Sequence, residues 1–325
     1  MIIEKISKNA RKKFKNYFIT NYDIYRLIKF VNKPCDIWSL IQRSGYPIPF
    51  VIFVLEELEK RNFIKISKNK IHPLVSQREK VTHANNFRVR TLTPIPIFSQ
   101  LPLSFRSVQK RVRYIINKVV PGGKMAILGD DDLLSLRVSK TNNFKEILVL
   151  EIDKRICDLI NNLAKKTKLN INVIQFDIRA PLPTKILNKY DIVFTDIPYS
   201  AKAFAVFVSR AIHLLKKGAG FHIFVSSSPL LPSIKTELEI QKVITKMNIY
   251  LVEKIHMANH KIPKRLMKKY NSFEKIKEIV TLRTSTLDKW YLENLAREEY
   301  LMQFATTEKT TPYIKNTFYY GDMYE

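Results

Sequence analysis

Acidic residues follow four apolar segments of the sequence, directly where each segment ends. The segments MAILG, EILVLEID, NINVIQFD and DIVFTDIP are rich in Ile, Val and Phe and have the length of buried strands. The acids at their ends are Asp130, Asp131, Asp132, Glu151, Asp153, Asp177 and Asp196. Ligands of an open α/β sheet bind outside the carboxyl ends of its strands. The spacing therefore predicts a ligand site lined by carboxylates.

The charge of these residues indicates what kind of ligand binds. A dinucleotide site needs G-x-G-x-x-G to receive a pyrophosphate, whereas here Gly129 alone is followed by three aspartates that repel phosphate. NAD, FAD and ATP are therefore disfavoured. Glu151 or Asp153 is suitably placed for ribose hydroxyls, and Asp177 can accept a hydrogen bond from an adenine amino group. The acids favour a phosphate-free, positively charged nucleoside related to S-adenosylmethionine.

The aspartates after Gly129 also bear on which sulfonium nucleoside binds. S-adenosylmethionine carries a carboxylate that would face Asp130–Asp132, and like charges repel. The decarboxylated form instead carries an aminopropyl arm that ends in an ammonium. The sequence favours the decarboxylated donor, with Gly129, Asp130, Asp131, Glu151, Asp153 and Asp177 as donor-binding residues.

The motif Asp-Ile-Pro-Tyr at residues 196–199 suggests the reaction. An amine that attacks the CH2 beside a sulfonium must first lose its proton, and a carboxylate can act as the general base. We assign this role to Asp196, with Pro198 fixing the turn and Tyr199 offering an aromatic wall to a cationic chain. Asp132 is assigned to the acceptor side as well.

Four of these motifs resemble one family. GDDDLLSL, VLEIDKR, QFDIRAPLP and TDIPYS are similar to the branched-chain polyamine synthases, the N4-bis(aminopropyl)spermidine synthases, over roughly residues 100–228. The resemblance implies aminopropyl transfer from decarboxylated S-adenosylmethionine to spermidine, release of methylthioadenosine, and no further cofactor. It also implies that Gln100 reaches the donor. Ile197 stands where the family has a proline.

The order of segments predicts the fold. Apolar strands alternate with helical segments from residue 121 to 290, which is typical of a Rossmann-like, doubly wound α/β sheet of the class I methyltransferase type. IYLVEKIHMA and EIVTLRTST are candidates for a closing strand pair. Residues 291–325 are expected to form a helix and a tail. Residues 1–80 have the helix, helix–turn–helix and hairpin pattern of a winged-helix domain, and 81–120 form a linker or hairpin and a lead-in helix.

Composition limits the class of protein. The 325 residues carry a net charge of +27, and the two cysteines, Cys35 and Cys157, exclude a disulfide framework. The histidines lack metal-ligand spacing, so we expect no metal site. No stretch resembles a signal peptide or a membrane span, which predicts a cytoplasmic protein. Partners are expected to be a polyamine substrate, a second copy in a homodimer and, weakly, nucleic acid.

Two other functions stay open at this point. Asp-x-Pro-Tyr also resembles the motif of N-methyltransferases that use S-adenosylmethionine, whose target here would be a nucleic acid or an amine. The second alternative is a winged-helix regulator whose sheet domain senses a nucleoside.

Overall fold

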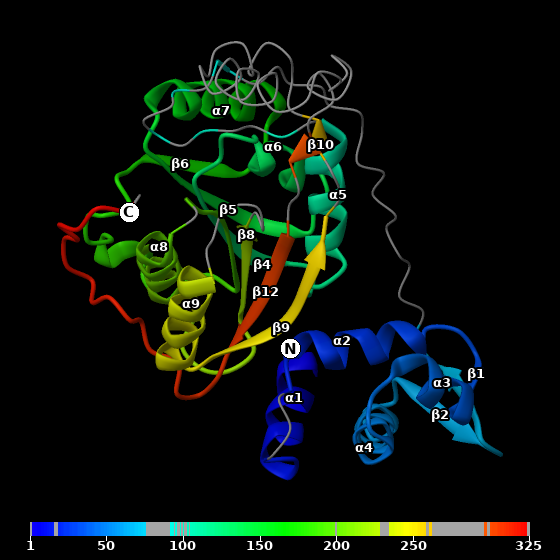
Figure 1. Ribbon diagram of the computed structural model, residues 1–325. Coiled ribbons are helices and arrows are strands. Elements are labelled where there is room, and N and C mark those ends of the chain that lie inside the picture. Colours follow the sequence, from blue (N-terminus) through cyan, green and yellow to red (C-terminus); the bar gives the residue numbers. More distant parts are fainter. Residues whose placement is uncertain are drawn as a thin grey trace, which may run out of the picture. The chain divides into compact units, whose positions relative to one another are not determined.

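The chain folds into two compact units. The computed structural model describes residues 2–15, 19–75, 105–198, 200–227, 234–257 and 300–323, with the short stretches 92–93, 95, 98, 100, 103, 260–261 and 296–297 (Figure 1). The first unit consists of Met1–Thr82 with Lys118–Val120, and the second of His83–Asn117 with Pro121–Glu325. In the described residues, no helix is both long and apolar enough to cross a membrane.

The first unit is built from short helices and a small sheet. Its elements in chain order are α1 (Ile2–Lys13), α2 (Asn21–Phe30), β1 (Cys35–Asp36), α3 (Ile37–Ser44), α4 (Ile48–Glu59), β2 (Ile64–Ser67) and β3 (Lys70–Pro73). The antiparallel strand order is β1-β3-β2. Local signals set the boundaries: Thr20 and Asp23 form a capping box at α2, and Gly45 ends α3 with φ of 68°.

The second unit contains a seven-stranded sheet of order β6-β5-β4-β7-β8-β12-β9. The strands are β4 (Gly123–Leu128), β5 (Phe144–Glu151), β6 (Ile171–Gln175), β7 (Ile192–Asp196), β8 (His222–Ser227), β9 (Ile249–His256) and β12 (Tyr300–Thr306). The first five are parallel, and β12 is antiparallel to both of its neighbours. The predicted α/β fold with a mainly parallel sheet is confirmed. The strand order reverses between β4 and β7.

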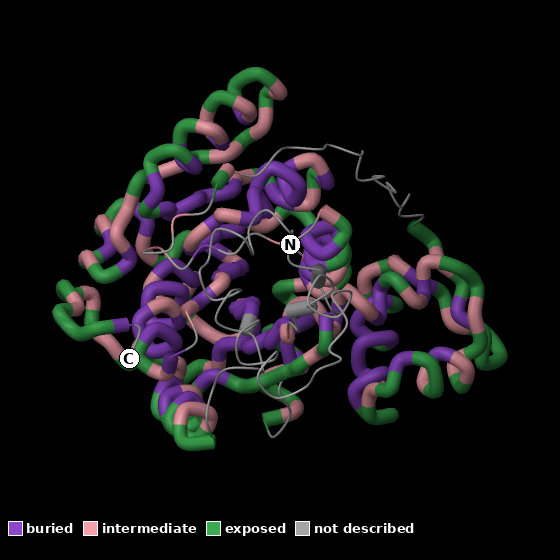
Figure 2. The backbone as a smooth tube through the Cα atoms, turned by 45° about the horizontal axis from the view of Figure 1, so that its top comes forward, coloured by how far each residue is buried: buried purple, intermediate pink, exposed green. Residues whose placement is uncertain are grey.

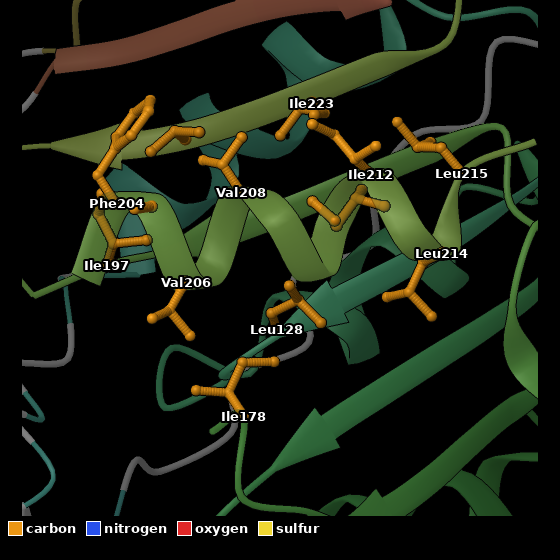
Figure 3. Close-up of a cluster of buried hydrophobic side chains, with 14 of the residues drawn as sticks. Leu128, Ile178, Ile197, Phe204, Val206, Val208, Ile212, Leu214, Leu215 and Ile223 are labelled. Atoms are coloured by element: carbon orange, nitrogen blue, oxygen red, sulfur yellow. The ribbon is translucent and has the colours of Figure 1, made fainter. Parts of the chain in front are cut away.

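Helices cover both faces of this sheet. α5 (Phe105–Ile116), α6 (Leu134–Ser139) and α7 (Lys154–Thr167) lie on one face, and α8 (Ala201–Leu214) and α9 (Ile234–Met247) lie on the other (Figure 1). The central strands are buried along most of their length (Figure 2). Phe204, Val208 and Ile212 of α8 pack with Leu128 and Ile223 of the sheet (Figure 3). The core therefore fixes the strands whose ends carry the acids.

One sequence prediction is wrong. A helix was expected within residues 291–325, but Tyr300–Thr306 form β12 between β8 and β9. The segment YLMQFAT is buried on both faces, so its apolar run lacks the alternation that separates a strand from a helix. β9 is confirmed as one strand of the closing pair, and its partner is β12. EIVTLRTST lies outside the described residues. The short strands β10 (His260–Lys261) and β11 (Ala296–Arg297) pair with each other.

The chain after β12 is held against the strand ends by Arg210. This arginine of α8 is fully buried and donates to the carbonyls of Ile178 (3.0 Å), Arg179 (3.0 Å), Lys315 (3.0 Å) and Thr317 (2.6 Å). It thereby ties the loop that follows β6 to the C-terminal segment. The short helix η2 (Thr184–Ile186) follows that loop.

Candidate active site

The turn after β4 requires glycine at its first position. Gly129 has a φ of 75°, in the left-handed region that other residues rarely adopt. Next, the Asp130 carboxylate accepts hydrogen bonds from the backbone N–H groups of Leu134 (2.7 Å) and Ser135 (3.3 Å) at the start of α6. Burial raises the pKa of Asp130 to about 7. Asp130 thus holds the first turn of the helix that follows the site.

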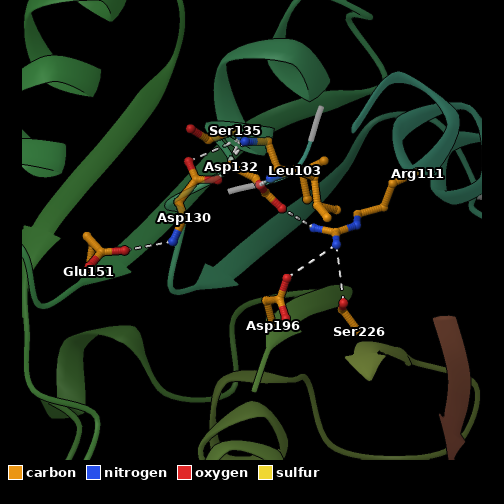
Figure 4. Close-up of polar contacts among 9 residues, drawn as sticks. Leu103, Arg111, Asp130, Asp132, Ser135, Glu151, Asp196 and Ser226 are labelled. Carbon is orange, nitrogen blue, oxygen red and sulfur yellow. Dashed lines mark hydrogen bonds and ion pairs between the residues drawn. The ribbon is translucent and has the colours of Figure 1, made fainter. Parts of the chain in front are cut away.

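Asp132 and Asp196 are joined by a buried arginine (Figure 4). Arg111 of α5 donates to Oδ2 of Asp132 at 2.7 Å and to Oδ2 of Asp196 at 3.2 Å. The backbone N–H of Leu103 binds the other oxygen of Asp132. Arg111 also donates to Oγ of Ser226 at 3.2 Å. The arginine and Asp132 are buried, whereas the Asp196 side chain is 20% exposed.

Asp131 lies between Asp130 and Asp132 in the sequence, and its side chain is half-buried. Burial raises its pKa well above the ordinary value, and the negative charges of Asp132, Asp196 and Glu151 add to that effect. Arg111 opposes the increase. A carboxylate with three acidic neighbours favours the approach of a cation.

The end of β5 and the start of α7 hold two further carboxylates in place. Glu151 accepts from the backbone N–H of Asp130 (2.7 Å) and of Asp153 (2.9 Å), and burial raises its pKa. Asp153 caps α7 and accepts from Arg155 (2.6 Å) and from Gln100 Nε2 (2.9 Å). Burial alone would raise the pKa of Asp153, but the hydrogen bonds from Arg155 and Gln100 outweigh it and lower the pKa.

Asp177 follows β6 and is paired with the arginine two residues on. Its carboxylate accepts from Arg179 Nη2 at 2.6 Å and from Nε at 3.0 Å. Burial opposes the effect, but these hydrogen bonds lower the pKa of Asp177. Asp177 therefore presents an ionised, half-exposed carboxylate.

The residues after Asp196 are held by core packing and by a helix cap. Ile197 is buried and packs in the core cluster beside α8 (Figure 3). Pro198 is half-buried, and Ser200 caps α8 by accepting from the N–H of Ala203 at 2.9 Å. Tyr199 lies outside the described residues. The helix cap and the apolar side chain both fix the turn that carries Asp196.

The structure brings Asp131, Asp132, Glu151 and Asp196 together, and Asp130 joins them through its backbone. Asp153 and Asp177 each pair with an arginine of their own loop. Within the described part of the chain, no three His, Cys, Asp or Glu side chains are grouped to hold a metal ion.

Arg111 is the main group that the sequence analysis missed. The segment SVQKRVRYIINKVV corresponds to the predicted lead-in helix, and its buried face includes Val108, Val112 and Ile115. Arg111 lies three residues after Val108 and four before Ile115, on that same face. A cation on the apolar face of a helix is the signal that could have located it.

The sheet order and the acidic strand ends define a Rossmann-like α/β protein with acids grouped at its switch point, where ligands of such sheets bind. The family model of the branched-chain polyamine synthase A C-terminal domain matches residues 89–322. The chain belongs to the branched-chain polyamine synthase family.

Relatives with assigned names agree with this membership. The N(4)-bis(aminopropyl)spermidine synthase of Thermococcus kodakarensis is 26% identical over 254 residues, 68% of this chain and 72% of the relative. The synthase of that name from Methanocaldococcus jannaschii is 25% identical and covers 79% of this chain and 82% of its own. An uncharacterised protein of M. jannaschii is 37% identical over 139 residues, and the match spans 43% of this chain and 34% of that relative.

A solved structure shares the fold. The Thermus thermophilus branched-chain polyamine synthase, in complex with N4-aminopropylspermidine and 5'-methylthioadenosine, superposes with a TM-score of 0.61 at 17% identity. The superposition covers 99% of this chain and 96% of that chain.

Proposed function

We propose that the protein transfers aminopropyl groups from decarboxylated S-adenosylmethionine to the secondary amine of spermidine. The observation that carries the proposal is the grouping of Asp131, Asp132 and Asp196 around Arg111 at the switch point of a sheet of this family. The acids favour two cationic substrates, and Asp196 is exposed enough to meet an amine.

The reaction proceeds by direct displacement. The carboxylate of Asp196 takes the proton of the acceptor's secondary ammonium. The freed nitrogen lone pair then attacks the CH2 next to the sulfonium, and a new C–N bond forms as the C–S bond breaks. The electron pair of the broken bond stays on sulfur, which leaves as neutral methylthioadenosine, and the acceptor nitrogen becomes a protonated tertiary amine. No further cofactor or metal is needed.

We assign Glu151, Asp153 and Asp177 to the nucleoside part of the donor. Each carboxylate oxygen has two lone pairs, so Glu151, which accepts one hydrogen bond at each oxygen, has capacity for ribose hydroxyls. Asp153 and Asp177 already accept two contacts at each oxygen, so each must exchange one of them for a hydrogen bond from the donor. Gln100 contributes by holding Asp153 through its 2.9 Å hydrogen bond. Gly129 lets the chain turn so that the donor can approach the end of β4.

We assign Asp131 and Asp196 to the reacting ends of the two substrates, with Pro198 and Tyr199 beside the acceptor chain. Asp132 is buried, and its oxygens are held from the protein side by Arg111 and by the Leu103 N–H. We therefore replace the earlier assignment of Asp132 to direct acceptor contact with a role through Arg111.

The decisive experiment incubates the protein with spermidine and either donor, followed by mass spectrometry. Aminopropylated products and methylthioadenosine should form with the decarboxylated donor. Methylated products from S-adenosylmethionine would instead favour the N-methyltransferase alternative.

We propose that the first unit is a winged-helix domain that binds DNA only weakly. The helices and the β1-β3-β2 sheet occur in the expected order, but α4 exposes Ile48, Glu56 and Glu59, which suit a phosphate backbone poorly. The full protein should bind duplex DNA without sequence preference and with a steep salt dependence. Tight binding of one sequence at physiological salt would support the regulator alternative.

We also propose a homodimer that works in the cytoplasm. Light scattering of the purified protein tests the first statement, and fractionation of the source cells tests the second.

A further inference from the structure

Arg111 is a buried cation among the acids of the site. It comes from α5, which precedes the sheet in the chain, and its side chain is 1% exposed. The guanidinium binds Asp132 after β4, Asp196 at the end of β7 and Ser226 of β8 (Figure 4). Its central carbon lies 5.0 Å from the ring centre of Phe194, so the ring supports the cation from one side. One side chain thus joins three strand ends.

From this geometry we infer that Arg111 is a positioning residue for the transfer reaction: it holds Asp196 by one oxygen and offsets negative charge, so that a bound acceptor can lose its proton. The inference rests on the proposed function. It goes further, because it assigns a role to a residue outside every acidic motif.

Arg111 fixes the orientation of the Asp196 carboxylate. Its Oδ2 is held by Arg111 at 3.2 Å. Among the described residues, Oδ1 has no hydrogen-bond partner. A carboxylate that is fixed through one oxygen presents the other in one direction, as a general base within hydrogen-bond reach requires. Arg111 therefore decides which oxygen faces the amine.

Arg111 also offsets part of the negative charge around the acceptor ammonium. Asp131 and Asp132 face the guanidinium from the β4–α6 loop, Asp196 faces it from β7, and Glu151 of β5 adds its charge to the group. Among the described residues, Arg137 of α6 is a second cation near these acids, and Ser226 of β8 contacts the guanidinium. An ammonium is stabilised by every uncompensated carboxylate close to it. Without Arg111, the site would hold the acceptor ammonium more firmly and release its proton less readily.

A purely structural role predicts a different outcome. If Arg111 only neutralised a buried charge, its loss would lower stability and the active fraction. The acceptor KM and the pH dependence of the remaining active protein would then stay unchanged. The two roles are therefore separated by kinetics rather than by the size of the activity loss.

The test compares Arg111→Met, the double variant Arg111→Met with Asp132→Asn, and Arg113→Met as a control. Arg113 is an exposed arginine on the same helix. The single variant should lower kcat about tenfold or more, leave the spermidine KM equal or lower, and move the rise of kcat about one pH unit upward. In the double variant, Asp132→Asn removes the negative charge that has lost Arg111 as its partner, and the asparagine oxygen can still accept from the Leu103 N–H. The kcat and the pH profile should therefore return toward those of wild type.

Calorimetry with spermidine, in the presence of methylthioadenosine, gives a readout that needs no turnover. The single variant should bind spermidine at least as tightly as wild type, and the control should match wild type. The inference is overturned if the single variant keeps the wild-type pH profile, or if the double variant recovers nothing. If Arg111→Met does not fold, the double variant provides the test. A rise of kcat that lies about one pH unit above that of wild type in the double variant would refute the role of Arg111 in offsetting negative charge. A wild-type protein that binds spermidine but forms no aminopropylated product would overturn the proposed function alone.

Discussion

The replacement Arg210→Met tests whether the C-terminal segment depends on one buried side chain. Methionine replaces the apolar stem of arginine with an unbranched chain, but it lacks the guanidinium and donates no hydrogen bond. Four carbonyls, those of Ile178, Arg179, Lys315 and Thr317, would lose their partner.

The magnitude follows from these four bonds. A hydrogen bond to a charged donor contributes about 1.5–3 kcal/mol, and a buried carbonyl left without a partner costs about 1–3 kcal/mol. In the variant, carbonyls of the C-terminal segment that become exposed can bind water instead. In the wild type, burial of the Arg210 guanidinium also costs free energy, as the lowered pKa of Arg210 indicates. We therefore expect a loss of about 3–5 kcal/mol rather than the full sum. At about 2–4 °C per kcal/mol for a unit of this size, Tm should fall by roughly 10 °C.

Differential scanning calorimetry of the full protein measures this change, with Lys202→Met as the control on the exposed side of the same helix. Hydrogen exchange should rise in residues 310–319, and donor affinity should fall because Asp177 directly precedes the freed Ile178 carbonyl. If Tm falls no more than in the Lys202→Met control, Arg210 does not stabilise the contact between the loop after β6 and the C-terminal segment.

Three further outcomes test the site. Asp196→Asn should keep the fold and donor binding but lower kcat by about 10²–10⁴-fold, measured by methylthioadenosine release, because an amide cannot take the proton; a loss within threefold would remove Asp196 from the mechanism. Asp131→Asn should narrow the preference for the decarboxylated donor over S-adenosylmethionine in calorimetry, and an unchanged ratio would place the donor's arm elsewhere. Donor affinity should rise as the pH passes about 7, where Asp130 becomes ionised and attracts the sulfonium; neutral methylthioadenosine should show no such rise.

The positions of the acids could be predicted because strand ends are local features. Buried strands of Ile, Val and Phe are evident from composition, and their carboxyl ends meet at one edge of any parallel sheet. The grouping of Asp131, Glu151 and Asp196 follows from that rule alone. Ile197 illustrates the same principle, since an apolar residue directly after a strand packs into the core and fixes the turn that carries the neighbouring carboxylate.

β12 and the contacts of Arg111 could not be predicted, for different physical reasons. A strand buried on both faces has no alternation, so YLMQFAT fits a helix or a strand until its neighbours β8 and β9 are known. Arg111 depends on a contact between residues 111 and 196, which no local pattern encodes.

The three consecutive aspartates show how far residue type alone determines function. Asp130 binds the amides of α6, Asp132 binds Arg111 and Leu103, and Asp131 faces the acids of the neighbouring strands. Each serves a different part of the site because successive side chains in a turn point in different directions. Arginines pair with Asp132, Asp153, Asp177 and Asp196, whereas the pKa values of Asp130, Asp131 and Glu151 are raised. We therefore expect the attraction for a cationic donor to be concentrated at the ends of β4 and β5, near the oxygen of Asp196 that Arg111 does not bind.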